Sequence, residues 1–334
     1  MVPTAASMAA SKFFGAMQLR LNIAFTVLAF CLSVVGSPPL ALVAGMFFAF
    51  AFGAPFPAHG PRFSKTLLQV CVVLLGFSMN LPVVLRAGLN GSLFAVATIG
   101  TTLLLGFWLG GRLALNSKTS ALISAGTAIC GGSAIAAVGS VIAVTEAEIA
   151  VAIGTVFLLN AAALYIFPLA GHALHLSPAD FGLWAGVAVH DISSVVGAAM
   201  SYGPGALETA TAVKLSRTLW IAPLTLGMAI WFRRKLAATP GAKTKAKIAV
   251  PWFIGFFLLA SLVRSCVPAI EEWTPWISQT ARGGMTLVLC LIGASISPAA
   301  LRTLGWRAVV LGVSLWLFIS VASLLAIHFL KLTA

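Results

Sequence analysis

Charged residues are scarce in this sequence. Only 8% of the 334 residues are Asp, Glu, Lys or Arg, and just seven of these are acidic, whereas an ordinary soluble domain carries roughly 25%. Apolar residues make up 60% of the chain, and the mean hydropathy is +1.06. This composition excludes an ordinary soluble domain and predicts an all-α polytopic membrane protein.

Paired cysteines and catalytic motifs are also missing. The five cysteines lie inside apolar stretches without CxxC spacing, so neither a disulfide framework nor a redox site is predicted. The chain has no GxSxG, HExxH, serine–lysine dyad or aspartate-rich prenyl-diphosphate motif. An integral membrane enzyme or binding protein is therefore a disfavoured alternative, and no cofactor or metal is predicted.

Apolar stretches long enough, or nearly so, to cross about 30 Å of hydrocarbon recur along the whole chain. We expect a cytoplasmic N-terminal segment of residues 1–20, followed by a single transmembrane domain over residues 21–332. About eleven helices are predicted in this domain, at 21–36, 39–54, 64–80, 91–111, 119–144, 149–170, 181–201, 209–232, 250–269, 281–297 and 306–330.

The positive charges predict the orientation. With the N-terminus in the cytoplasm, the basic residues outside the membrane fall on the inner side, except Arg86, Arg282 and Lys331. The basic loop 233–249 is then a cytoplasmic topology determinant, and the formal charge of +13 requires no nucleic-acid partner. A multi-pass inner-membrane protein is predicted. The acidic residues expected on the outer side are Glu146, Glu148, Glu208, Glu271 and Glu272.

Two internal similarities accompany this topology. Residues 64–90 resemble residues 281–306, with Gly76 aligned to Gly293, and the predicted topology gives the two stretches opposite directions. This pattern is typical of an inverted repeat. A weaker similarity relates residues sixty positions apart, such as Gly126 and Gly186. The predicted topology makes these two segments parallel, which an inverted repeat does not explain.

The fifth segment is interrupted in its middle by Cys130-Gly131-Gly132-Ser133. Because each glycine costs about 1 kcal/mol relative to alanine inside a helix, we predict a broken helix here. Gly131 would end the first half-helix and Ser133 would cap the second, which directs free N–H groups towards the middle of the membrane. Such an end is an anion site. Close helix packing on the glycines is the alternative.

Few ionisable residues are expected at membrane depth: His190, Asp191, Lys214, Arg217 and Arg264. A charge there costs about 2.5–3.5 kcal/mol, so these residues should face the protein interior or a cavity. A salt bridge between Asp191 and Arg217 is the structural alternative, but it would still leave a surplus of positive charge. The surplus predicts an anionic ligand.

The adjacent His190 and Asp191 allow several interpretations. They form a titratable pair that could take up a proton during transport. A packed, hydrogen-bonded histidine is the alternative. An HD metal motif is disfavoured because no other His, Asp or Glu is expected at this depth to complete a coordination shell.

Five stretches of the chain resemble a known family. GTAICGGSAIAAV, AVHDISSVVGAA, AVKLSRTLWIAPL, PWFIGF and LIGASISPAALRTLGWR look like the YeiH-like sulfate exporter family of bacterial inner-membrane proteins, over essentially the whole chain from Leu67. The resemblance implies a helical transporter related to the sodium/proton-antiporter and bile-acid-symporter folds, with broken helices that cross at the substrate site. This chain departs from the family pattern at Ile192-Ser193-Ser194, where Val-Ala-Gln is usual.

We therefore predict a secondary transporter that exports a small inorganic or sulfur-containing anion, sulfate first, with H⁺ or Na⁺ as a coupling ion. A cation/proton antiporter is the alternative, and a homo-oligomer is left open. The element opposite the break is either the tenth segment near Gly293 or the seventh near Asp191. The predicted coupling residues are His190 and Asp191. The predicted substrate residues are Thr127, Cys130, Gly131, Gly132, Ser133, Ala134, Lys214, Arg217 and Ser295.

Overall fold

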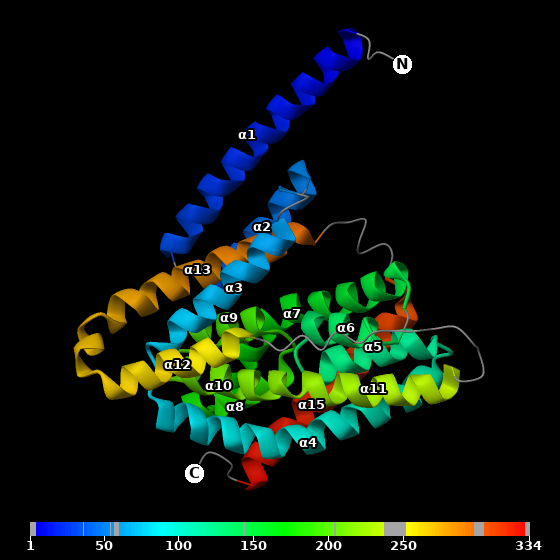
Figure 1. Cartoon of the computed structure of the whole chain (residues 1–334), viewed down its shortest axis with the longest axis vertical. Helices are drawn as coiled ribbons and strands as arrows, with labels where there is room; N and C mark the ends of the chain where they lie inside the picture. The colour runs from blue at the N-terminus through cyan, green and yellow to red at the C-terminus, as the bar shows by residue number, and fades with distance from the viewer. Residues whose placement is uncertain are drawn as a thin grey trace.

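The computed structural model describes residues 5–35, 37–53, 55–56, 60–142, 144–203, 205–236, 252–296 and 304–330. All regular structure in these ranges is helical, which confirms the all-α prediction (Figure 1). Four stretches are each apolar and long enough to cross a membrane: Met17–Val35, Glu146–Ala173, Ala206–Phe232 and Trp306–Phe329. The expected total of about eleven crossing helices is not confirmed.

The helices separate into two groups by their contacts. The first group is α1 (Ala5–Val35), α2 (Pro38–Phe52), α3 (Gly60–Gly76), α12 (Trp252–Cys266) and α13 (Thr274–Ser295). The second group contains α4 (Leu81–Arg112), α5 (Ser117–Ala128), α6 (Gly132–Gly139), α7 (Glu146–Ala173), α8 (Pro178–Ala188), α9 (Ile192–Tyr202), α10 (Ala206–Leu219), α11 (Ile221–Leu236) and α15 (Trp306–Leu330). The groups meet where α9 contacts α2 and α13, and where α4 contacts α12.

Helix α1 projects from the rest of the molecule (Figure 1). Residues 5–20 belong to it, so the predicted N-terminal segment continues into the expected first span without a break. Several apolar side chains on this helix are exposed, including Phe30 at 68% and Val34 at 75%. Such side chains are suited to contact with lipid. The cytoplasmic location of the N-terminus stays a prediction.

Helices α3 and α13 run in opposite directions. The Thr274 hydroxyl, at the start of α13, lies 3.5 Å from the carbonyl oxygen of Phe77, just after the end of α3. Further along, Gly284 packs on the thiol of Cys71. These opposite directions are the ones expected for residues 64–90 and 281–306. The inverted repeat itself stays a prediction, because residues 297–303 lie outside the described part of the chain, as does most of the basic loop 233–249.

The predicted break at Cys130-Gly131 is confirmed, but the two halves do not continue in one direction. α5 ends at Ala128 and α6 begins at Gly132, and the side chain of Ile135 folds back onto Gly126. Asn116 precedes α5 and Glu148 lies in the first turn of α7, and the Asn116 side-chain amide donates to Glu148 at 2.8 Å. α5 is about 18 Å long, so residues 116 and 148 could not meet unless α6 returned alongside α5. The segment is a helical hairpin, with α5 and α6 side by side in Figure 1.

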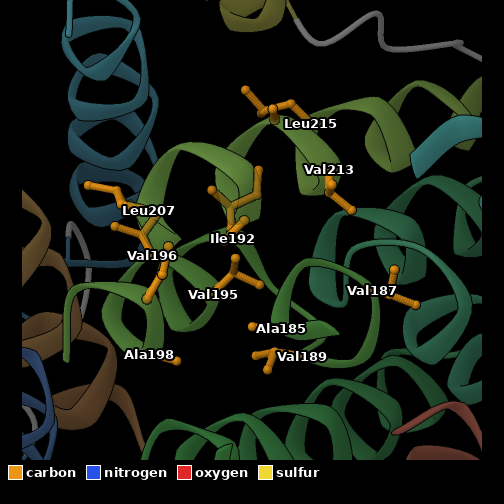
Figure 2. Close-up of a cluster of buried hydrophobic side chains, with 14 of the residues drawn as sticks. Ala185, Val187, Val189, Ile192, Val195, Val196, Ala198, Leu207, Val213 and Leu215 are labelled. Atoms are coloured by element: carbon orange, nitrogen blue, oxygen red, sulfur yellow. The ribbon is translucent and has the colours of Figure 1, made fainter. Parts of the chain in front are cut away.

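The predicted seventh helix is also a hairpin. α8 and α9 are joined by the extended residues Val189, His190 and Asp191. The Tyr202 hydroxyl, at the end of α9, donates to the Leu176 carbonyl just before α8, and its ring stacks on Phe181 at 3.8 Å between centroids. Figure 2 shows apolar side chains of α8, α9 and α10 gathered beside this turn.

The two hairpins enter from opposite ends of α7. The first has its base at the α7 N-terminus, and the second has its base at the C-terminus, where His172 stacks on Tyr202 at 4.3 Å. The 28 residues of α7 separate these ends by about 42 Å. The expectation that both segments cross the membrane is therefore wrong. The sixty-residue similarity relates two hairpins of opposite orientation, not two parallel helices.

This arrangement corrects the side assigned to two glutamates. Glu146 and Glu148 begin α7 beside Asn116, so they lie on the same side of the molecule as Lys118. Glu208 begins α10 near the base of the second hairpin, on the other side. Each hairpin replaces one expected membrane crossing. Because two crossings are removed, the helices after the second hairpin keep the orientation expected from the sequence.

Local sequence explains where these elements start. Thr145 and Glu148 form a capping box at α7, and Ser177 caps α8 by accepting from the Asp180 amide at 3.1 Å. Exposed tryptophans stand at other helix starts, including Trp306 at 67% and Trp276 at 70% exposure. Tryptophan at helix ends is typical of membrane interfaces.

Candidate functional site

The tips of the two hairpins meet beside the middle of α7. Asn160 lies midway along this helix, and its amide nitrogen donates to Asp191 while its oxygen accepts from the His190 amide at 3.1 Å. Gly131, in the tip of the first hairpin, packs against Asp191 and His190. The element opposite the break is therefore the seventh segment near Asp191, not the tenth near Gly293.

Gly131 fits this contact for two reasons. Its φ of +65° and ψ of −125° lie in a region that other residues rarely adopt. A Cβ at this position would lie 3.3 Å from Val156 and 3.5 Å from the Cβ of Asp191. The glycine thus permits the turn, and a side chain in its place would press on Val156.

Asp191 caps the second half of its hairpin. It occupies the N-cap of α9 and accepts from the Ser194 amide at 2.8 Å. Its carboxylate also accepts from the hydroxyls of Ser193 and Ser194 and from Asn160. A carboxylate at this position compensates the positive end of α9.

Each hairpin has a first half-helix, α5 or α8, whose carbonyl end carries a partial negative charge. Arg217 and Lys214 compensate these two ends. The Lys214 ammonium donates to the Val189 carbonyl at the end of α8, at 2.5 Å. The Arg217 guanidinium donates to the Ala128 carbonyl at the end of α5, and to the Thr98 hydroxyl at 2.8 Å. Both cations are fully buried. The alternative interpretation, a salt bridge between Asp191 and Arg217, is not formed.

The N-terminus of α6 is the fourth half-helix end at this junction. Its N-cap is Gly131, and no side chain in the described part of the chain caps it. Here Gly132 is half-buried and Ser133 is exposed, although both lie at the depth of Asp191 and Asn160. The first-turn amides of a helix have no intrahelical acceptor. This end therefore presents donors to an accessible surface at mid-depth.

Several buried polar atoms at the junction have no partner among the described residues. They are both ring nitrogens of His190, the Thr127 hydroxyl and Nε of Arg217. His190 is 0% exposed. The Cys130 thiol, in the first tip, lies within reach of the Ala134 amide and the Thr218 hydroxyl of α10. Buried polar groups normally have partners, so these atoms point to water or a ligand at the junction.

The structure therefore brings most of the predicted residues together. Thr127, Cys130, Gly131, Gly132, Ser133 and Ala134 form the first tip, His190 and Asp191 form the second, and Lys214 and Arg217 contact both from α10. Their binding and coupling roles stay predictions.

Two predicted residues lie elsewhere. Ser295 lies at the end of α13 in the other helix group, and its hydroxyl donates back to Ile292 at 2.7 Å. Arg264, expected at membrane depth, instead pairs with Glu271 at 3.1 Å beyond the end of α12.

Sequence reasoning missed Asn160 and Thr98. Asn160 is buried at 3% exposure and joins the two tips, and Thr98 accepts from Arg217. An asparagine in the middle of an otherwise apolar 28-residue helix was a detectable signal, because polar residues at membrane depth are commonly functional. A threonine carries no such signal, since its hydroxyl can bond to its own helix.

The chain matches known sequences over most of its length. Residues 17–312 match the family model described as Conserved hypothetical protein 698. A UPF0324 membrane protein of Porphyromonas gingivalis is 47% identical over 293 residues, which cover 86% of each chain. Another, from Bacteroides thetaiotaomicron, is 43% identical over 295 residues, covering 88% of this chain and 87% of the relative. No solved structure matches the chain.

Proposed function

Because the chain belongs to the Conserved hypothetical protein 698 family, whose relatives are named membrane proteins, we propose that it is a secondary transporter of a small inorganic or sulfur-containing anion. Sulfate is the first candidate, and export across the inner membrane is the proposed direction. The protein acts by binding and translocation, without a catalytic step.

One observation carries this proposal: three of the four half-helix ends at the junction are compensated and the fourth is not. A helix end carries a partial charge of about half a unit, positive at the N-terminus. Asp191 compensates α9, Lys214 compensates α8 and Arg217 compensates α5. The uncapped positive end of α6 would be compensated by an anion.

The proposed anion contacts the first turn of α6. Gly132 and Ser133 offer amides and one hydroxyl, on a surface that is accessible at mid-depth. Lys214 and Arg217 add positive potential from α10, where the carbonyl oxygens of Val189 and Ala128 accept from them. Low polarity around buried charges strengthens this attraction.

The cation/proton antiporter receives less support. A cation would need free acceptor positions on Asp191, and four donors already contact its carboxylate. For a coupling proton, His190 is the other titratable candidate at the junction, and its ring nitrogens have no partner among the described residues. If His190→Gln left the pH dependence of transport unchanged, the coupling proton would have to bind elsewhere.

The proposal is tested on purified protein. Thermal shifts are measured with sulfate, sulfite, thiosulfate, taurine, sodium and chloride across pH, since a ligand that binds the native state stabilises it. Flux of the stabilising anion is then measured in proteoliposomes. Ser133→Ala should weaken its binding about tenfold, the loss of one charge-assisted hydrogen bond.

Ser140→Ala is the matched control, because Ser140 lies at the other end of α6 and its hydroxyl donates to Ala137 at 2.7 Å. The α6 site is wrongly placed if both serine variants bind the anion as the wild type does. Anion transport is the wrong function if none of the anions stabilises the protein or crosses the vesicle membrane.

A further inference from the structure

Asp191 is a carboxylate at mid-depth with every acceptor position occupied. A carboxylate offers about four lone-pair positions. Oδ1 accepts from the Ser193 hydroxyl at 2.5 Å and from the Ser194 amide at 2.8 Å. Oδ2 accepts from the Ser194 hydroxyl at 2.9 Å and from the Asn160 amide. This arrangement leaves no position for a metal cation.

Two of these four donors are hydroxyl groups of adjacent serines. Ser193 and Ser194 are 1% and 4% exposed, so water does not readily replace them. The Ser194 amide is fixed by the helix, and Asn160 is held by its second bond to His190. Removing the hydroxyls would therefore open two acceptor positions while leaving the other two donors in place.

Asp191 is only half-buried as a residue, so a small ion can approach it. Oxygen ligands, carboxylates first, are what hard cations prefer. The last carbonyl groups of α8, which precede Asp191, have no intrahelical partner and could complete a coordination shell, although Lys214 already occupies the one at Val189. Without the two serine hydroxyls, Asp191 and these carbonyl groups would form a cluster of oxygen atoms with free acceptor positions.

We infer that Ser193 and Ser194 are positioning residues that close Asp191 to monovalent cations. The inference goes beyond the proposed function, because it concerns rejection of a cation at the start of α9. Anion binding at α6 is a separate property.

The experiment measures sodium binding directly. The melting temperatures of wild type and of Ser193→Ala/Ser194→Ala are compared in sodium chloride and in choline chloride of equal concentration. The wild type should melt at the same temperature in both salts. The double variant should melt several degrees higher in sodium, because sodium would bind its native state alone.

Two further variants isolate the cause. Ser201→Ala is the matched control on α9, since its hydroxyl donates to Gly197 at 2.9 Å and does not contact Asp191. It should behave as the wild type. Ser193→Ala/Ser194→Thr restores one hydroxyl and should lose most of the sodium effect, which a general loosening of the helix would not produce.

The inference is overturned if sodium stabilises the wild type as much as the double variant, or if it stabilises neither. Should the double variant not fold, the two single alanine variants decide by the same measurement, since each opens one acceptor position. No step uses anion transport. A failure of the anion site would leave the sodium comparison unaffected, and a failure of the sodium comparison would leave the anion site untouched.

Discussion

The backbone of Gly131 lies against Asp191, so that a Cβ on the glycine would be 3.5 Å from the Cβ of the aspartate. These residues are sixty positions apart and belong to hairpins that enter from opposite ends of α7. The contact places an uncapped helix start beside a carboxylate that caps another. The charge balance at the junction depends on the two tips remaining this close.

Gly131→Ala should strain the first tip. Alanine at φ +65° costs about 1–3 kcal/mol, and its Cβ would also press on Val156 at 3.3 Å. We expect a lower melting temperature and loss of anion transport. Gly100→Ala is the matched control, because a Cβ there meets nothing within 4 Å. Equal behaviour of the two variants would contradict the close packing at Gly131.

The hairpin topology predicts a specific labelling pattern. The exposed native cysteines Cys31 and Cys266 are first replaced by serine. Single cysteines are then introduced at three exposed positions: Ser117, Glu146 and His175. A membrane-impermeant maleimide should label positions 117 and 146 from one side and position 175 from the other. If residues 119–144 crossed the membrane, 117 and 175 would share a side and 146 would lie opposite.

Asn160→Ala should destabilise the junction by about 1–3 kcal/mol. The substitution leaves the buried His190 amide without its acceptor and removes one donor from Asp191. Denaturant unfolding of the purified protein measures the loss. Thr155→Val on the same helix removes only a hydroxyl that bonds to Val151 at 2.8 Å, so it serves as the control. Equal stability of the two variants would mean that Asn160 does not join the tips.

Arg217→Ala should impair both the fold and transport. The Ala128 carbonyl and the Thr98 hydroxyl lose their donor, and the carbonyl end of α5 loses its compensating charge. We expect a lower melting temperature together with loss of anion flux in proteoliposomes. Arg217→Lys keeps the charge and one donor, so it should recover part of both. Unchanged flux in Arg217→Ala would show that the anion does not depend on this charge.

The sequence by itself determined the features that depend on local composition. Scarce charge and long apolar runs predicted a helical membrane protein, and adjacent glycines predicted the break at Gly131. The positions of Asp191, Arg217 and the Gly131-Gly132 break within their apolar segments predicted that these three features share one depth. These properties can be read locally because the cost of a charge in hydrocarbon, or of a glycine in a helix, does not depend on distant residues.

Only the tertiary structure decided the path of the chain after each break. A stretch of 21 residues such as 124–144 is long enough for one crossing of about 30 Å, and it can also form two half-helices that fold back on each other. Local pattern does not separate these outcomes. The contacts of Asn116 with Glu148 and of Leu176 with Tyr202 do, because each joins the two ends of a hairpin.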